Sequence, residues 1–313
     1  MRGCPYCAAA FKAIDEVKKN YAATELEIID KNLQPALAEK FTDYYYVPSM
    51  YVDGKKIYEA HPGETYDECL ANVKKVFEVA NRSKAVVLLS GGLDSTTCLA
   101  IAVKKWGREN VSAVSIFYGQ RHAEELKSAR AVAKFYSVAH YELDAAEIFS
   151  HSNSALLDTS TESLEKSSYA AQIEKNNSPR IATYVPFRNG LFLSMAASFA
   201  DSLYDDCVEL YIGVHSDDAA GHAYADCSAQ FIASMKAAIR IGTYEKINLV
   251  APFLCEKKSD VVKVGLELGA PYHLTRSCYE RGDKPCGQCA TCLDRAKAFE
   301  LNGVKDPALD YFF

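Results

Sequence analysis

The sequence has 313 residues and lacks any long hydrophobic run, although 49% of its residues are hydrophobic. A membrane-spanning helix needs about 20 consecutive apolar residues, and no run approaches that length. The first residues, MRGCPYC, also lack the charged and apolar regions of a secretion signal. These two absences predict a cytoplasmic protein with no membrane partner.

Basic residues are not in excess either. Lysine and arginine total 35 against 41 aspartates and glutamates, which gives a net charge of −6. Because proteins that bind large nucleic acids usually carry a basic surface, this balance argues against a nucleic-acid partner. Eleven cysteines without a secretion signal indicate thiols used for metal binding or redox chemistry, not structural disulfides.

The stretch Leu88–Cys98 reads LLSGGLDSTTC and lies between an apolar run and a helical pattern, so it predicts strand, glycine turn and helix. Two glycines let the backbone approach a ligand, and the helix N-terminus favours an anion. The stretch matches neither GxxxxGK[ST] nor GxGxxG. A helix cap at Asp94 or Ser95 would explain a shorter motif, but the full string SGGLDST favours a nucleotide site.

This stretch resembles the PP-loop of the ATP pyrophosphatases, a family that holds the pyrophosphate of ATP and activates a carboxyl or carbonyl group as an adenylate. The resemblance implies that ATP binds with Mg²⁺. The residues expected to bind ATP are Leu88, Leu89, Ser90, Gly91, Gly92, Leu93, Asp94, Ser95, Thr96, Thr97 and Cys98. We expect Asp94 and Ser95 to be catalytic, together with Lys258 and Arg121, whose charges would balance the phosphates in the transition state.

Residues 1–80 carry a separate signal, because the CPYC motif at residues 4–7 opens a helical pattern. A CxxC at a helix N-terminus favours the thiolate of its first cysteine. The block resembles a glutaredoxin through this motif, Val47-Pro48 and a hairpin at Asp53-Gly54. The resemblance implies a smaller thioredoxin-like domain, with a further strand expected at Glu25–Ile29.

In glutaredoxins the first cysteine of the motif, here Cys4, attacks a disulfide, and the second, here Cys7, resolves the mixed disulfide. Two buried or metal-binding thiols are the alternative. Only three residues precede Cys4, fewer than the roughly five of the family's first strand. Either the true start lies upstream, or the domain is degenerate. We therefore expect weak thiol–disulfide exchange.

After a polar break at Asn81–Lys84, predicted strands and helices alternate. Alternation predicts an α/β domain over residues 84–313, with a doubly wound parallel sheet whose ligands lie at the carboxyl ends of the strands. The predicted strands are at 85–89, 111–117, 140–143 and 208–213, and the helices are at 98–105, 123–135, 190–203, 228–241, 259–268 and from 293. The polar segment His151–Thr183 is either a plain insertion or a lid over the active site.

Four cysteines cluster near the C-terminus as Cys278-x7-Cys286-x2-Cys289-x2-Cys292. Four thiolates in so short a span can enclose one tetrahedral zinc ion, which leaves no open coordination position and so predicts a structural role. An iron–sulfur cluster is the alternative, because C-x2-C-x2-C also occurs in ferredoxins.

Taken together, residues 84–313 resemble the 7-cyano-7-deazaguanine synthases. The matching motifs are SGGLDST (90–96), YGQRH (118–122), VPFRN (185–189), GVHSDD (213–218), Asp226-Cys227, KSDV (258–261) and the cysteine cluster. The resemblance implies that ATP activates 7-carboxy-7-deazaguanine, that free ammonia forms an amide, and that a second ATP converts the amide into a nitrile. It implies a homodimer as well. The residues expected to bind the deazaguanine are Gln120, Arg188, Asn189, His215, Asp217, Asp218 and Asp226.

One departure concerns the substrate pocket. Where the family reads Gly-Tyr-Pro-Asp-Cys-Arg, this chain has Ala225 in place of the proline and Ser228 in place of the arginine. Three alternatives therefore stay open: a deazaguanine ligase that uses an amine other than ammonia, a tRNA-thiolating PP-loop enzyme, and a redox sensor whose loop only binds a nucleotide.

Overall fold

The computed structural model describes residues 3–21, 24–52, 54–80, 85–121, 124–176, 181–205, 207–217, 224–280, 282 and 284–309. The chain forms two compact units, Met1–Arg82 and Ser83–Phe313, and each is described by itself. The predicted linker at 81–84 lies outside the described residues. In the part of the chain that is described, no helix combines the length and apolar character needed to cross a membrane.

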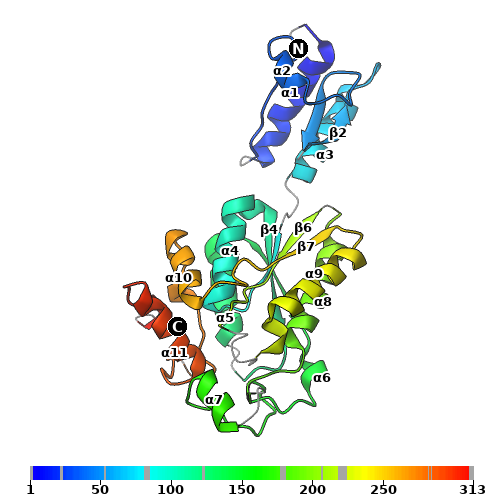
Figure 1. Ribbon diagram of the computed structural model, residues 1–313. Helices are drawn as coiled ribbons and strands as arrows, with labels where there is room; N and C mark the ends of the chain where they lie inside the picture. The colour runs from blue at the N-terminus through cyan, green and yellow to red at the C-terminus, as the bar shows by residue number, and fades with distance from the viewer. Residues whose placement is uncertain are drawn as a thin grey trace. The chain divides into compact units, whose positions relative to one another are not determined.

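The first unit is an antiparallel hairpin packed against two helices (Figure 1). Its elements are α1 (Pro5–Val17), α2 (Pro35–Ala38), β1 (Ser49–Val52), β2 (Lys55–Glu59) and α3 (Tyr66–Ala80), with a short 3-10 helix at Lys18–Asn20. Small and apolar side chains of α1 and α3 form the core, among them Ala13, Val73 and Phe77. The turn between β1 and β2 contains Gly54 at φ 79°, while Asp53 lies outside the described residues.

The prediction of a strand at Glu25–Ile29 is wrong, because these residues form no strand. A strand needs a neighbour for its backbone N–H and C=O groups. Among the described residues of this unit, β1 and β2 pair only with each other. Ile28 is 59% exposed, so the segment also lacks a buried face. The apolar pattern suggested a strand, but none of the described residues of this unit forms a partner strand beside it.

The second unit contains a five-stranded parallel sheet in the order β5-β4-β3-β6-β7. The strands are β3 (Ala85–Leu88), β4 (Val111–Phe117), β5 (Ala139–Asp144), β6 (Val208–Tyr211) and β7 (Ile247–Val250), of which β7 was not predicted. The chain runs outward from β3 to β5 and then returns to place β6 on the other side of β3. The strand order therefore reverses beside β3, where open α/β sheets bind their ligands.

Helices cover both faces of this sheet (Figure 1), which confirms the predicted doubly wound α/β fold. The helices are α4 (Leu93–Trp106), α5 (Glu124–Tyr136), α6 (Ala146–Phe149), α7 (Tyr169–Asn176), α8 (Arg188–Leu203), α9 (Ala229–Gly242), α10 (Lys258–Glu267) and α11 (Ala290–Leu301). Short 3-10 helices lie at Arg108–Asn110, Ala225–Cys227, Tyr272–Leu274 and Pro307–Leu309. Side chains alternate along a strand, so Val86 and Leu88 of β3 face α8 and α9, whereas Ala85 and Val87 face α4, α5, α10 and α11.

The segment His151–Thr183 is more than a polar loop. Leu156, Leu157 and Ile181 are buried in the core beside α8, and Gln120 and Leu157 form an isolated antiparallel bridge. The segment also contains α7, while residues 177–180 lie outside the described ranges. A few apolar residues within a polar stretch therefore attach this segment to the sheet.

Candidate active site

The glycine loop lies at the end of β3, where the strand order reverses. Gly91 has φ 84°, and a Cβ there would come within 2.6 Å of the backbone nitrogen of Ala129 in α5. Gly213, which follows β6, approaches the loop closely from the other side. A Cβ added at Gly213 would lie 2.8 Å from backbone atoms of Asp94 and Ser95. Only glycine permits both approaches, so the loop is enclosed by α5 and β6.

Polar groups converge at the start of α4. The hydroxyl oxygens of Ser90 and Ser95 lie 3.1 Å apart, and the N–H of Gly92 donates to Ser90 Oγ at 3.2 Å. Asp94 Oδ1 and Thr96 Oγ1 are buried without a hydrogen-bond partner among the described residues. Because unpaired buried polar atoms are costly, the Asp94 oxygen suits a Mg²⁺ ion, and the helix N-terminus suits the phosphate. Thr96 does not line the cavity beside the loop.

Lys258 brings a positive charge to this loop. Its Nζ lies 3.2 Å from Asp94 Oδ2 and 3.3 Å from His215 Nε2, and His215 Nε2 lies 3.6 Å from Asp94 Oδ1. An ammonium group only donates, so Nε2 of His215 is the accepting nitrogen. Burial alone would raise the pKa of Asp94, but the charge of Lys258 and its hydrogen bond outweigh burial and hold this pKa below its ordinary value. The carboxylate is therefore ionised.

A cavity of about 210 Å³ opens beside the loop. Ser90, Ser95 and Lys258 line one end. Five aromatic side chains form part of the remaining wall, together with aliphatic residues and the acidic Glu125 and Asp294. The aromatic residues are Tyr118, Tyr169, Phe192, Tyr224 and Tyr279. Tyr118 belongs to the predicted YGQRH motif, and Tyr279 follows Cys278 of the cysteine cluster. Tyr169 and Phe192 lie in α7 and α8 without a local signal, so the sequence interpretation missed the aromatic part of this wall.

Three of the predicted substrate residues line the cavity: Gln120, Arg188 and Asn189. Gln120 Oε1 accepts the backbone N–H of Tyr118 at 2.9 Å. The guanidinium carbon of Arg188 lies 5.5 Å from the centre of the Tyr118 ring. His215 is 2% exposed and approaches the loop through Lys258.

Other predicted site residues are not among those that line this cavity. Asp217 accepts the backbone N–H of Lys258, and Asp226 accepts that of Asn189, each at 2.9 Å. Both carboxylates therefore stabilise the first turn of a helix that carries a site residue. Asp218 lies outside the described residues.

Three more predicted site residues contact groups away from the cavity lining: Arg121, Thr97 and Cys98. Arg121 donates to the carbonyl oxygens of Leu157 and Ser160, at 2.8 and 2.6 Å, and so holds the segment that follows β5 and α6. Thr97 Oγ1 lies 2.7 Å from the hydroxyl of Tyr272. Cys98 and Leu93 are fully buried in the core under the loop.

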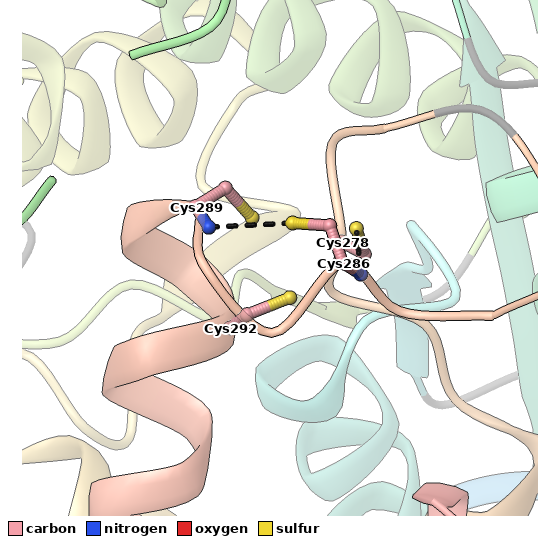
Figure 2. A group of neighbouring side chains, drawn as sticks. All are labelled: Cys278, Cys286, Cys289 and Cys292. Carbon is pink, nitrogen blue, oxygen red and sulfur yellow. Dashed lines mark hydrogen bonds between the residues drawn. The ribbon is translucent and has the colours of Figure 1, made fainter. Parts of the chain in front are cut away.

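The four C-terminal cysteines come together, as the sequence predicted. The sulfurs of Cys278, Cys286, Cys289 and Cys292 lie within 4.8 Å of one another. Figure 2 shows them pointing toward one another from a loop and the start of α11. The backbone N–H groups of Cys286 and Cys289 donate to the sulfurs of Cys278 and Cys286, both at 3.3 Å. This set of donors fits a four-coordinate metal ion such as zinc.

The cysteine cluster is connected to the glycine loop. The backbone N–H of Arg276 donates to the carbonyl oxygen of Gly91 at 3.0 Å. Thr291 Oγ1, one residue before Cys292, donates to the carbonyl oxygen of Ser277 at 2.6 Å. The residues of this segment that line the cavity are Ser277, Tyr279, Thr291 and Asp294. A metal at the cluster would therefore hold one wall of the cavity.

In the first unit, Cys4 caps the N-terminus of α1 and accepts the N–H of Cys7 at 3.4 Å. Burial tends to raise the pKa of Cys4, but the hydrogen bond from the Cys7 backbone and further hydrogen bonds outweigh it, so this pKa is lowered. Cys7 is 5% exposed, and burial raises its pKa. The Cys4 thiol lies 3.7 Å from the carbonyl oxygen of Val47, whose peptide bond to Pro48 is cis. The two thiols therefore differ in acidity, because the pKa of Cys4 is lowered and that of Cys7 is raised.

A parallel sheet with a phosphate-binding loop after its central strand, and with a lysine–aspartate pair at that loop, defines an α/β nucleotide-binding protein of the PP-loop type. Residues 84–303 match the model of one family, described as queuosine biosynthesis protein QueC, and the chain belongs to this family.

Two named relatives each match 72% of this chain. A 7-cyano-7-deazaguanine synthase of Archaeoglobus fulgidus is 39% identical over 227 residues, which is 72% of this chain and 90% of that protein. One of Thermoplasma volcanium is 42% identical over 228 residues, 72% of this chain and 89% of that protein. Among solved structures, an NMN synthetase of Francisella tularensis matches with a TM-score of 0.37 and 14% identity, over 72% of this chain and 79% of that one.

Proposed function

We propose that the second unit converts 7-carboxy-7-deazaguanine and ammonia into 7-cyano-7-deazaguanine (preQ0), an ATP-dependent carbon–nitrogen ligase reaction of queuosine and deazapurine biosynthesis. The observation that carries the proposal is the identity of 39% and 42% to two named synthases over about nine tenths of their lengths. The phosphate-binding loop and Lys258 line one cavity within the matched region.

The chemistry suits these residues. A carboxylate is a poor electrophile, and adenylation by ATP supplies AMP as a leaving group that ammonia displaces to give an amide. A second adenylation, on the amide oxygen, followed by loss of AMP and of the nitrogen-bound protons, gives the nitrile. Ser90, Ser95 and the start of α4 would hold the pyrophosphate, Lys258 would balance its charge, and Asp94 Oδ1 would reach Mg²⁺ through water.

The test is a product assay on the full chain with 7-carboxy-7-deazaguanine, ATP, Mg²⁺ and ¹⁵N-ammonium. Mass spectrometry is expected to find the nitrile with one ¹⁵N atom, and AMP and pyrophosphate in twofold excess over it. An amide product that never loses its oxygen would reject nitrile formation. In a parallel assay with an organic amine, a product joined to that amine would support the ligase that uses a different amine. ATP binding without pyrophosphate release would support the redox sensor whose loop only binds a nucleotide.

We further propose that the metal is zinc, one ion per chain, with a structural role. The support is the set of four thiols, of which Cys278, Cys289 and Cys292 are buried. Elemental analysis of the purified protein tests this assignment. If iron and acid-labile sulfide are found, the four cysteines bind an iron–sulfur cluster and the zinc assignment is wrong. A cytoplasmic location, a homodimer and the absence of a nucleic-acid partner stay predictions.

A second candidate function concerns the first unit, for which we propose weak glutaredoxin-like thiol–disulfide exchange. The lowered pKa of Cys4 at the N-terminus of α1 favours it. With reduced glutathione as reductant, the protein is expected to reduce a glutathionylated peptide, and Cys4→Ser to abolish that reduction. Cys207→Ser, which changes an exposed cysteine of the second unit, is the control. Equal rates for wild type and Cys4→Ser would exclude the redox role.

A further inference from the structure

Arg188 lines the cavity and forms no ion pair with a carboxylate among the described residues. It has a hydrogen bond with the hydroxyl of Tyr118, and its charge also interacts with the carboxylate of Asp226. Its guanidinium carbon lies 5.5 Å from the ring centre of Tyr118 and 6.0 Å from that of Phe192. The nearby carboxylate of Asp226 accepts the backbone N–H of Asn189. Aromatic faces and a tyrosine hydroxyl orient a guanidinium but do not neutralise it. Because Asp226 is not in ion-pair contact with Arg188, the guanidinium can still pair with an anionic ligand.

The phosphate end of the cavity has its own positive groups. Lys258 pairs with Asp94 there, and the N-terminus of α4 favours an anion. Arg188, by contrast, lies at the start of α8, which covers the opposite face of the sheet from α4 (Figure 1). A flat heteroaromatic ring fits this aromatic region by stacking, and a guanidinium within it suits a carboxylate attached to such a ring.

We propose that Arg188 binds the carboxylate of the flat heteroaromatic acid and thereby selects the acid substrate over its neutral amide. This inference rests on the proposed function and assigns its substrate recognition to one residue. A guanidinium matches a carboxylate with two parallel N–H donors, a geometry that neither lysine nor a neutral amide partner reproduces. Once the carboxylate has become an amide, the charge is gone, so Arg188 acts on the first half of the reaction more than on the second.

The experiment compares the acid and the amide, 7-amido-7-deazaguanine, as substrates of wild type, Arg188→Gln and Arg188→Lys. We expect Arg188→Gln to raise the KM for the acid by about 10- to 100-fold, the usual range for losing a charge-assisted hydrogen bond. In Arg188→Gln, the KM for the amide and the KM for ATP are expected to change less than about threefold by the same reasoning. In Arg188→Lys, the KM for the acid is expected to lie between the values for wild type and Arg188→Gln. Arg240→Gln, at an exposed arginine of α9, is the matched control.

An equal rise in KM for acid and amide would overturn the inference and leave Arg188 a structural role. A rise confined to ATP would overturn it as well, because Arg188 would then bind the nucleotide. If wild type converts neither substrate, the proposed function fails. Calorimetric titration of the acid into the full chain then still decides the inference, since equal affinity for wild type and Arg188→Gln would overturn it.

Discussion

Replacing Lys258 with methionine is expected to lower kcat/KM for ATP-dependent product formation by about 10²- to 10³-fold, the range found when one group that stabilises transition-state charge is removed. Nζ of Lys258 lies at the phosphate-binding loop, 3.2 Å from Asp94. Methionine keeps the length of the side chain and removes the charge. Pyrophosphate release, followed at saturating and at low ATP, measures the effect on kcat and KM separately.

Lys263→Met is the matched control, because Lys263 lies exposed on the same helix, α10. Removing Lys258 also leaves the buried carboxylate of Asp94 without its ion pair, so its pKa is expected to rise toward or above its ordinary value. A thermal melt of each variant separates this effect on stability from the loss of chemistry. A folded Lys258→Met variant with activity within about fivefold of wild type would be incompatible with a transition-state role of the expected size.

Loss of the metal is expected to have the second large effect. In Cys289→Ser the cluster loses one of four thiol ligands, and structural metal sites contribute about 10–16 kcal/mol of binding energy in small zinc peptides. The segment that the cluster organises bonds to Gly91 through Arg276 and carries cavity residues such as Tyr279. We therefore expect metal content, melting temperature of the second unit and pyrophosphate release to fall together, the last by at least about tenfold because the site is displaced.

Elemental analysis, a thermal melt and the pyrophosphate assay measure these three quantities. The control is Cys255→Ser, which changes an exposed cysteine outside the cluster. Removal of the metal from wild type with a chelator should reproduce the Cys289→Ser phenotype, and added zinc should reverse it. Full activity in a protein without metal would show that the cluster does not support the cavity.

Features that depend on neighbouring residues in the chain were predictable. The glycine loop is one example, because a strand, two glycines and a helix N-terminus are adjacent in sequence and their geometry is local. The four cysteines are another, since short spacings force them together whatever the rest of the chain does. Strands were less predictable: β7 was missed and Glu25–Ile29 was wrongly assigned, because a strand exists only where another strand lies beside it.

The roles of individual polar side chains depended on the tertiary structure. The resemblance predicts that Asp217 and Asp226 bind a guanine-like ring, and this stays a prediction. The structure adds that each accepts a helix N–H that the fold brings to it. The predicted role of Arg121 at the phosphates also stays a prediction, and the structure adds that Arg121 donates to carbonyl oxygens of a distant segment. A carboxylate or guanidinium bonds to the nearest suitable group, and long-range packing decides which group that is.

The sequence by itself therefore determined the doubly wound α/β fold, the phosphate-binding loop and the cysteine cluster, all set by local spacing and by alternation of strands and helices. Lys258 was expected near the phosphates from the resemblance, and the tertiary structure added its ion pair with Asp94, 164 residues away. The tertiary structure alone decided that aromatic residues of α7 and α8 line the cavity around Arg188. The physical reason is that backbone geometry follows from neighbours in the chain, whereas contacts between distant side chains follow from how the helices pack on the sheet.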